Sequence, residues 1–160
     1  MDSREAAFSI WIDADSCPKK AREIALRCAA RLHVPAYLVA NRQIPYDRQN
    51  AMARMVLAPK EQDGADTYIA EHAEKEDIVI TKDIPFAARL VEKGICAMND
   101  RGVVFRRDNI DALLAERNYS VFIARLGLAA GGGTSYSKDD VHKFANCLDN
   151  IVAKKIRRPR

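Results

Sequence analysis

The chain has 160 residues, of which 48% are apolar and 30% charged, a composition that suits one folded domain and excludes a disordered chain. No apolar run approaches the ~18–20 residues of a membrane-spanning helix, and the N-terminus lacks the apolar core of a secretory signal. The four cysteines are scattered without CxxC spacing, which argues against structural zinc and against a disulfide framework. We therefore expect a reduced, cytoplasmic protein with no membrane partner.

The positive charge is concentrated at the C-terminus. The net charge is +4, and the last seven residues, KKIRRPR, hold five cations, so removing them leaves −1 for residues 1–153. We expect a single domain over residues 1–153 and a basic tail over residues 154–160. The tail can contact nucleic-acid phosphates, or it can be a solubilising end. Its candidate phosphate-binding residues are Lys154, Lys155, Arg157 and Arg158.

The predicted elements of the first hundred residues alternate between strand and helix. Residues 9–12 predict a strand, and an apolar stripe from Ala21 to Leu32 at helical spacing predicts a helix with Ser16 as its N-cap. The elements that follow are strands at 37–40 and 55–58, a helix from near Asp66, a strand at 78–81, a helix that ends at Gly94, and a strand at 95–98.

The pattern becomes mainly helical after Asn99. We expect a short edge strand at 103–105, a helix from Asp108 to about Glu116 and a separate helical piece over 119–126. Three glycines at 131–133 predict a hinge. Ser137 and Asp140 form a capping box for a last helix that runs to about Lys154. The predicted fold is a three-layer, Rossmann-like α/β domain, with a mostly parallel five-stranded sheet and a helical C-terminal part.

Aspartates follow two of the predicted strands. Asp13 and Asp15 come directly after the first strand, and Thr81 and Asp83 end the fourth. Ligands of open parallel sheets bind at the carboxyl ends of the strands, so we expect these side chains to meet, with Asp66 joining them from a helix. Clustered carboxylates repel unless they hold protons or a cation, and an oxygen-only ligand set favours Mg²⁺ or Mn²⁺.

This cluster predicts metal-assisted phosphodiester hydrolysis. The ordinary alternative for one Asp after a strand is a helix cap or a turn. Cys17 beside the acids is expected to be a packing residue. The predicted catalytic residues are Asp13, Asp15 and Asp83; the predicted metal ligands are Asp13, Asp66 and Asp83; the predicted substrate contacts here are Ser16, Asn41, Thr81 and Lys82.

Several segments resemble the YaiI/YqxD family of small bacterial proteins. They include IWIDADSCP at 10–18, DGADTYIAEHA at 63–73 and DIVITKDIPFAARLVEKG at 77–94. The sequence departs from that family in having Ser16 where Ala is common and Phe86 where Leu is usual.

That family is in turn similar to the PIN-like and NYN nucleases, which have acids at the positions of Asp13, Asp66 and Asp83. The resemblance implies a PIN-like fold, metal-dependent ribonuclease chemistry and RNA as a partner.

Two alternatives remain open from the sequence. Ile12–Asp15 resembles the opening motif of haloacid-dehalogenase phosphatases, with Asp13 as nucleophile and Asp15 as acid/base. That chemistry needs a later acidic pair, for which the sequence offers only Asp139 and Asp140. The second alternative is a nucleic-acid or protein-binding module without turnover, which the near-neutral body favours.

Overall fold

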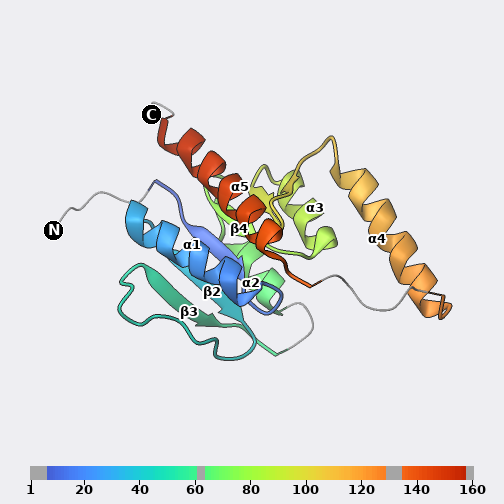
Figure 1. The fold of residues 1–160 in the computed structure, drawn as a ribbon, viewed down its shortest axis with the longest axis horizontal. Coiled ribbons are helices and arrows are strands. Elements are labelled where there is room, and N and C mark those ends of the chain that lie inside the picture. The colour runs from blue at the N-terminus through green and yellow to red at the C-terminus, as the bar shows by residue number, and fades with distance from the viewer. Residues whose placement is uncertain (1–6, 61–63, 129–134, 158–160) are drawn as a thin grey trace.

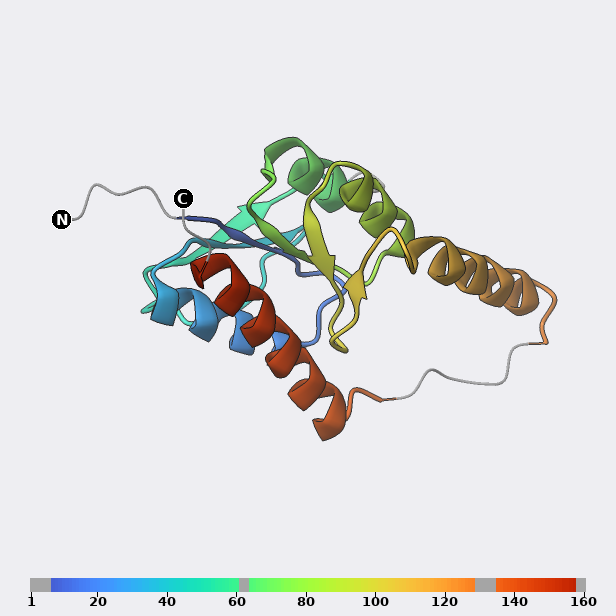
Figure 2. The same ribbon diagram turned by 90° about the horizontal axis from the view of Figure 1, so that it is seen from above.

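Figure 1 shows the fold in a computed structural model, which describes residues 7–60, 64–128 and 135–157. A sheet lies between helices in a three-layer α/β arrangement (Figures 1 and 2). The elements in chain order are β1 (Ile10–Asp13), α1 (Lys19–Leu32), β2 (Ala36–Ala40), β3 (Ala53–Leu57), α2 (Gly64–His72), β4 (Ile78–Ile80), α3 (Ile84–Glu92), β5 (Cys96–Met98), β6 (Val104–Phe105), α4 (Ile110–Arg125) and α5 (Lys138–Arg157).

The sheet has the strand order β3-β2-β1-β4-β5-β6. The first five strands of this order are parallel, and β6 pairs antiparallel with β5. The predicted α/β class is confirmed. The short edge strand expected at 103–105 is β6, so the sheet has six strands where the prediction counted five. After β3 the chain crosses back to place β4 on the other side of β1. The carboxyl ends of β1 and β4 therefore form the point where strand order reverses, which is where open α/β sheets bind ligands.

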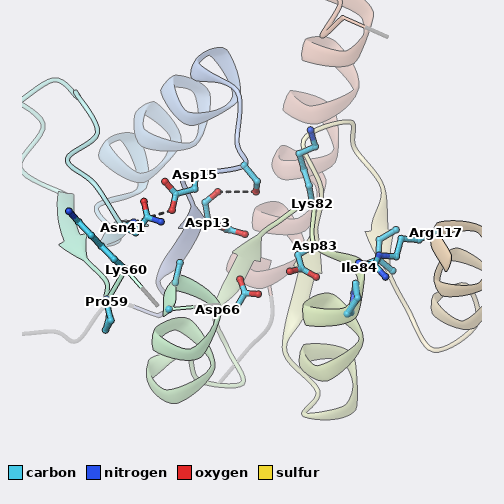
Figure 3. Close-up of a pocket in the computed structure, with 14 residues that line it drawn as sticks. Asp13, Asp15, Asn41, Pro59, Lys60, Asp66, Lys82, Asp83, Ile84 and Arg117 are labelled. Atoms are coloured by element: carbon cyan, nitrogen blue, oxygen red, sulfur yellow. Dashed lines mark hydrogen bonds between the residues drawn. The ribbon is translucent and has the colours of Figure 1, made fainter. Parts of the chain in front are cut away.

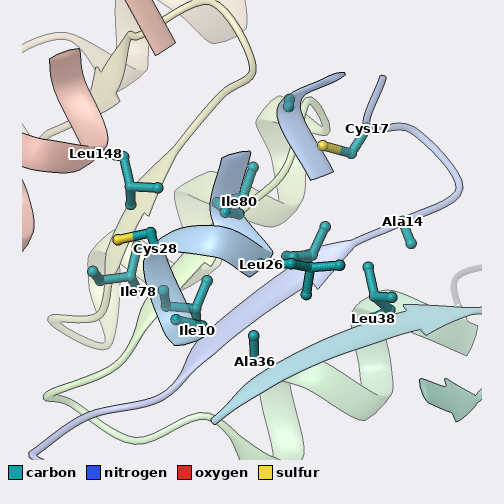
Figure 4. Close-up of a cluster of buried hydrophobic side chains, with 14 of the residues drawn as sticks. Ile10, Ala14, Cys17, Leu26, Cys28, Ala36, Leu38, Ile78, Ile80 and Leu148 are labelled. Atoms are coloured by element: carbon teal, nitrogen blue, oxygen red, sulfur yellow. The ribbon is translucent and has the colours of Figure 1, made fainter. Parts of the chain in front are cut away.

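The two central strands are apolar on both faces because helices cover both sides of the sheet. Alternate side chains point to opposite faces. Ile10, Ile12 and Ile80 belong to a core cluster beneath α1 and α5, which Figure 4 shows. Trp11 and Val79 belong to the other cluster, against α2 and α3.

The first and last helices begin differently. The N-cap of α1 is Pro18, which has extended backbone and makes no side-chain cap. The predicted Ser16 cap is therefore wrong: the Ser16 hydroxyl instead donates to the Asp13 carbonyl across the turn after β1, at 3.3 Å. The capping box of α5 is confirmed. The Ser137 amide donates to Asp140 Oδ2 at 2.9 Å, and the Asp140 amide donates to Ser137 Oγ at 3.1 Å.

Helix α4 is continuous, whereas the sequence predicted two pieces. Its first half packs on the body through Leu113 and Leu114. The large apolar side chains of its second half, such as Tyr119 and Phe122, are exposed. The apolar positions thus change to another face of one helix, and the sequence contains no Gly or Pro to break it.

Two further predictions concern glycines and membrane segments. Gly94 has the positive φ of 76° expected after the end of α3. The glycines at 131–133 lie outside the described residues. Within the described part of the chain, no helix combines the length and apolarity needed to cross a membrane.

Candidate functional site

A pocket of about 550 Å³ opens at the carboxyl ends of β1 and β4 (Figure 3). Two loops and the starts of α2 and α3 complete it. Its lining residues are Asp13, Asp15, Ser16, Asn41, Pro59, Lys60, Gly64, Ala65, Asp66, Lys82, Asp83, Ile84, Pro85 and Arg117. The structure thus brings together at one sheet edge the four aspartates expected there. Thr81 does not line the pocket and lies behind Asp13, 1% exposed.

Asp13 is the most buried acid of the pocket, with 6% of its surface exposed. Burial raises the pKa of its carboxyl above the ordinary 3.8, and the negative charges of Asp15 and Asp83 raise it further. The Thr81 hydroxyl opposes this by donating to Asp13 Oδ2 at 2.9 Å. Asp13 therefore holds its charge at a cost that a bound cation would reduce.

Asp83 caps a helix and also lines the pocket. It is the N-cap of α3, since its Oδ1 accepts from the Phe86 amide at 3.0 Å. It also lines the pocket and is close enough to Asp13 for its charge to act on that carboxyl. The Asp83 amide donates to Thr81 Oγ1 at 3.1 Å, so the Thr81 hydroxyl connects the two acids. Capping fixes the position of Asp83 and leaves its second oxygen for other partners.

Asp15 points toward the end of β2. Its Oδ2 accepts from the Asn41 amide at 3.0 Å, and its Oδ1 lies 3.7 Å from Nε of Arg42. Both carboxylate oxygens thus have partners. Asp15 holds the β2 end against the β1 end and thereby keeps Asn41 at the pocket.

The start of α2 brings Asp66 to the pocket. Asp66 is in the first turn of this helix and is 7% exposed. Gly64 allows the approach, because a Cβ there would lie 2.1 Å from the Pro59 carbonyl oxygen. Only glycine lets the helix begin this close to the loop after β3.

Three cations line the same pocket. Lys82 was expected from its place after β4, whereas Lys60 and Arg117 were missed. Lys60 follows the end of β3, so the rule that found Asp13 and Asp83 could have found it too. Arg117 comes from α4, and no local pattern marks it because only the packing of α4 on α3 places it there.

The acids do not form a cluster of three or more ligands. Among the described residues, no group of three or more His, Cys, Asp or Glu side chains is arranged to hold a metal ion. Asp13, Asp66 and Asp83 all line the pocket, and their role as metal ligands stays a prediction.

The cations of the last helical turn lie away from the pocket. Lys155 donates from Nζ to the Glu76 carbonyl at 2.7 Å and lies 5.7 Å from the ring centre of Phe8. Both contacts precede strands, so this turn lies at the amino-terminal edge of the sheet. Lys154 and Arg157 belong to the same turn, and Arg158 lies outside the described residues.

Two other features singled out in the sequence do not line the pocket. Asp139 and Asp140 begin α5 and do not line the pocket. Cys17 is 5% exposed, and burial raises the pKa of its thiol to about 12. The thiol is therefore neutral and packs in the core, as expected.

Comparisons with known proteins agree on one relationship. The family described as "Uncharacterized BCR, YaiI/YqxD family" matches residues 11–154. The chain belongs to this family. Among curated relatives, a UPF0178 protein of Treponema denticola is 41% identical over 150 residues, covering 94% of this chain and 95% of its own length. A UPF0178 protein of Psychromonas ingrahamii is 42% identical over 147 residues, covering 92% and 97% respectively.

The relationship covers the pocket but names no activity. The family match spans every acid and cation that lines the pocket, from Asp13 to Arg117. The family description and the names of these relatives mention no reaction. No solved structure matches the chain significantly.

Proposed function

We propose that the pocket binds RNA and hydrolyses its phosphodiester bonds with a bound Mg²⁺ or Mn²⁺ ion. One observation carries this proposal: two carboxylates, Asp13 and Asp83, share a pocket with Lys60, Lys82 and Arg117. The cations suit phosphate oxygens, whereas the carboxylates repel phosphate unless a positive ion lies between them. A pocket with both kinds of group suits a phosphate ester together with a metal ion.

The donor atoms suit a hard divalent cation. The Thr81 hydroxyl donates a hydrogen bond to one oxygen of Asp13, and the Phe86 amide donates to one oxygen of Asp83. Each carboxylate has a second oxygen that can bind an ion. Mg²⁺ is commonly held by one or two carboxylates, with waters and substrate phosphates completing its shell. Such an ion supplies neutralisation of phosphate charge and a water of lowered pKa.

The chain's own residues have distinct roles in this proposal. Asp13 and Asp83 hold the ion. The Thr81 hydroxyl orients the Asp13 carboxylate and holds the Asp83 backbone amide, while the helix cap orients the Asp83 carboxylate. The Lys60, Lys82 and Arg117 side chains bind and orient the phosphates of the strand.

Asp15 and Asn41 act as a unit. Both oxygens of Asp15 are engaged, so we assign it the positioning of Asn41 rather than proton transfer. Asn41 then offers its side-chain amide to the substrate from the end of β2.

A non-catalytic RNA-binding module is the second candidate. It is favoured by one observation: among the described residues, no three acids are arranged around a common ion. The phosphatase alternative has less support, because the acidic pair that it requires, Asp139 and Asp140, does not line the pocket.

Cleavage of a labelled single-stranded RNA in Mg²⁺, Mn²⁺ or EDTA tests the proposal. Asp83→Asn separates the charge of this residue from its capping role. Asn caps a helix about as well as Asp, so α3 stays capped while the charge is lost. We expect Asp13→Asn and Asp83→Asn to lower the cleavage rate about 100-fold or more, which corresponds to ~2.7 kcal/mol. Asp139→Asn is the matched control and should cleave like the wild type.

The outcomes separate the candidates. Metal-dependent cleavage that is lost in both pocket variants supports the nuclease. RNA binding without cleavage under any metal condition supports the binding module. If the protein neither binds nor cleaves RNA, the proposal is wrong, and small phosphoesters become the next substrates to try.

A further inference from the structure

Helix α4 presents an apolar seam on its outer side, with the large side chains of the seam in the second half. Ala112, Ala115, Tyr119, Phe122 and Leu126 follow one another at spacings of three, four, three and four residues. This is the heptad spacing of a coiled-coil contact. Tyr119, Phe122 and Leu126 are 65%, 56% and 53% exposed, and both alanines are exposed as well.

The seam is available to a partner because of how α4 attaches. The helix packs on α3 and on the second core cluster through Leu113 and Leu114. At 3.6 residues per turn these two side chains point to the side opposite the seam. Figures 1 and 2 both show α4 extending beyond the rest of the fold. The attachment of α4 to its own body therefore leaves the seam outside.

The charges beside the seam discriminate between partners. Asp111, Glu116 and Arg125 occupy positions that flank a heptad seam, where charged pairs set orientation. A second copy in antiparallel orientation places Asp111 of each chain beside Arg125 of the other, giving two ion pairs and bringing only the two Glu116 side chains together. Parallel pairing instead places each Asp111 beside a Glu116 and gives no ion pair. The charges thus favour an antiparallel copy of this same helix.

We propose that the protein self-associates as a symmetric dimer through antiparallel pairing of the α4 seams. Each chain contributes the same patch, as a two-fold interface requires. Tyr119 and Phe122 supply the main apolar contacts, and the two alanines allow the helix backbones to approach closely. The seam covers only two heptads, so the dimer should dissociate on dilution. This proposal is independent of the nuclease chemistry, because the seam contains no residue of the pocket.

Sedimentation or light scattering over a concentration series tests the seam. We expect the full wild-type chain to form a dimer that dissociates on dilution. Phe122→Glu should be monomeric at every concentration and should melt like the wild type at concentrations where the wild type is monomeric. Leu57→Glu is the matched control. Leu57 is 58% exposed on the edge strand β3, so this variant should dimerise like the wild type. A monomeric wild type, or a dimer lost in Leu57→Glu and kept in Phe122→Glu, would overturn the proposal.

Charge reversal tests the antiparallel orientation. Asp111→Arg and Arg125→Asp each replace both ion pairs by like charges, so each variant alone should dimerise at least tenfold more weakly than the wild type. An equimolar mixture of the two restores both pairs between unlike chains and should recover heterodimers. In a parallel dimer, Asp111→Arg would face Glu116 and would strengthen self-association. That result, or a mixture that fails to associate, would show the orientation to be wrong.

Discussion

Two aspartates at opposite edges of the sheet are equally buried but have very different surroundings. Asp13 at the carboxyl edge and Asp77 at the amino edge are each 6% exposed. Asp77 accepts three hydrogen bonds: from the Ser9 amide at 2.8 Å, from Trp11 Nε1 at 2.9 Å and from the Glu74 amide at 2.9 Å. These contacts tie the loop before β4 to the start of β1.

Asp13 has the opposite surroundings. Burial raises the pKa of its carboxyl, hydrogen bonding from Thr81 and Ser16 opposes this, and the negative charges of Asp15 and Asp83 raise the pKa further. An acid whose charge is satisfied by its own fold stabilises that fold. An acid whose charge is poorly satisfied retains the capacity to bind something else. The difference indicates a structural role for Asp77 and supports the binding role that we propose for Asp13.

The largest expected effect comes from replacing each acid by asparagine. In Asp77→Asn either orientation of the amide turns its NH₂ group toward an N–H donor, because both oxygens of Asp77 accept hydrogen bonds. We expect a loss of about 2–4 kcal/mol in the free energy of unfolding, since an unpaired buried donor costs about 1–3 kcal/mol. Asp13→Asn removes a repelled charge and should change stability by less than about 1 kcal/mol. Urea unfolding of both variants measures the comparison, and equal losses would contradict it.

A smaller effect is expected at Thr81, which connects the two pocket acids. Thr81→Val keeps the shape but removes the donor to Asp13 and the acceptor of the Asp83 amide. We expect a loss of about 1–2 kcal/mol in unfolding free energy. The double variant with Asp13→Asn should show non-additivity, because the two side chains share one hydrogen bond. Additive losses in this cycle would mean that the hydroxyl stabilises Asp83 alone.

The smallest effect is a dependence of stability on pH. The pKa of Asp13 is raised in the folded state, so the folded protein binds a proton more readily than the unfolded chain does between pH 3.8 and that raised value. Stability therefore falls as the pH rises through this window, and acidification should stabilise the wild type relative to Asp13→Asn. Unfolding of both proteins in EDTA at several pH values measures the difference. A difference of the opposite sign would show that Asp13 is stabilised as a carboxylate.

The periodicity of the sequence predicts most of the fold because burial follows it. The alternation of apolar runs with helical stripes identifies the five parallel strands and the helices that cover them. The errors arise where individual contacts, which periodicity does not reveal, decide the outcome. Ser16 could have capped a helix, yet its hydroxyl bonds the Asp13 carbonyl in the turn, and α1 begins only after Pro18. The apparent break in α4 arises because the apolar residues of its first half face the core, whereas those of its second half face outward.

The pocket was predictable to the extent that it is built from strand ends. Asp13, Asp15 and Asp83 follow strands, and parallel strands bring their carboxyl ends together whatever the loops do. Arg117 could not be found this way, because its place depends on how α4 crosses α3. The C-terminal cations could be counted from sequence, but α5 carries Lys155 to the other edge of the sheet.

The position of α5 determines when each face of the sheet is covered during synthesis. The cluster beneath α2 and α3 has its last members at Leu113 and Leu114, whereas the cluster beneath α1 needs Phe144, Leu148 and Val152 from α5. At 5–20 residues per second, the ribosome needs about 2–8 s to add the intervening stretch. For those seconds the nascent chain has one closed face and one apolar face that α1 covers only in part. That interval is when a chaperone that recognises exposed apolar surface has its best opportunity to bind.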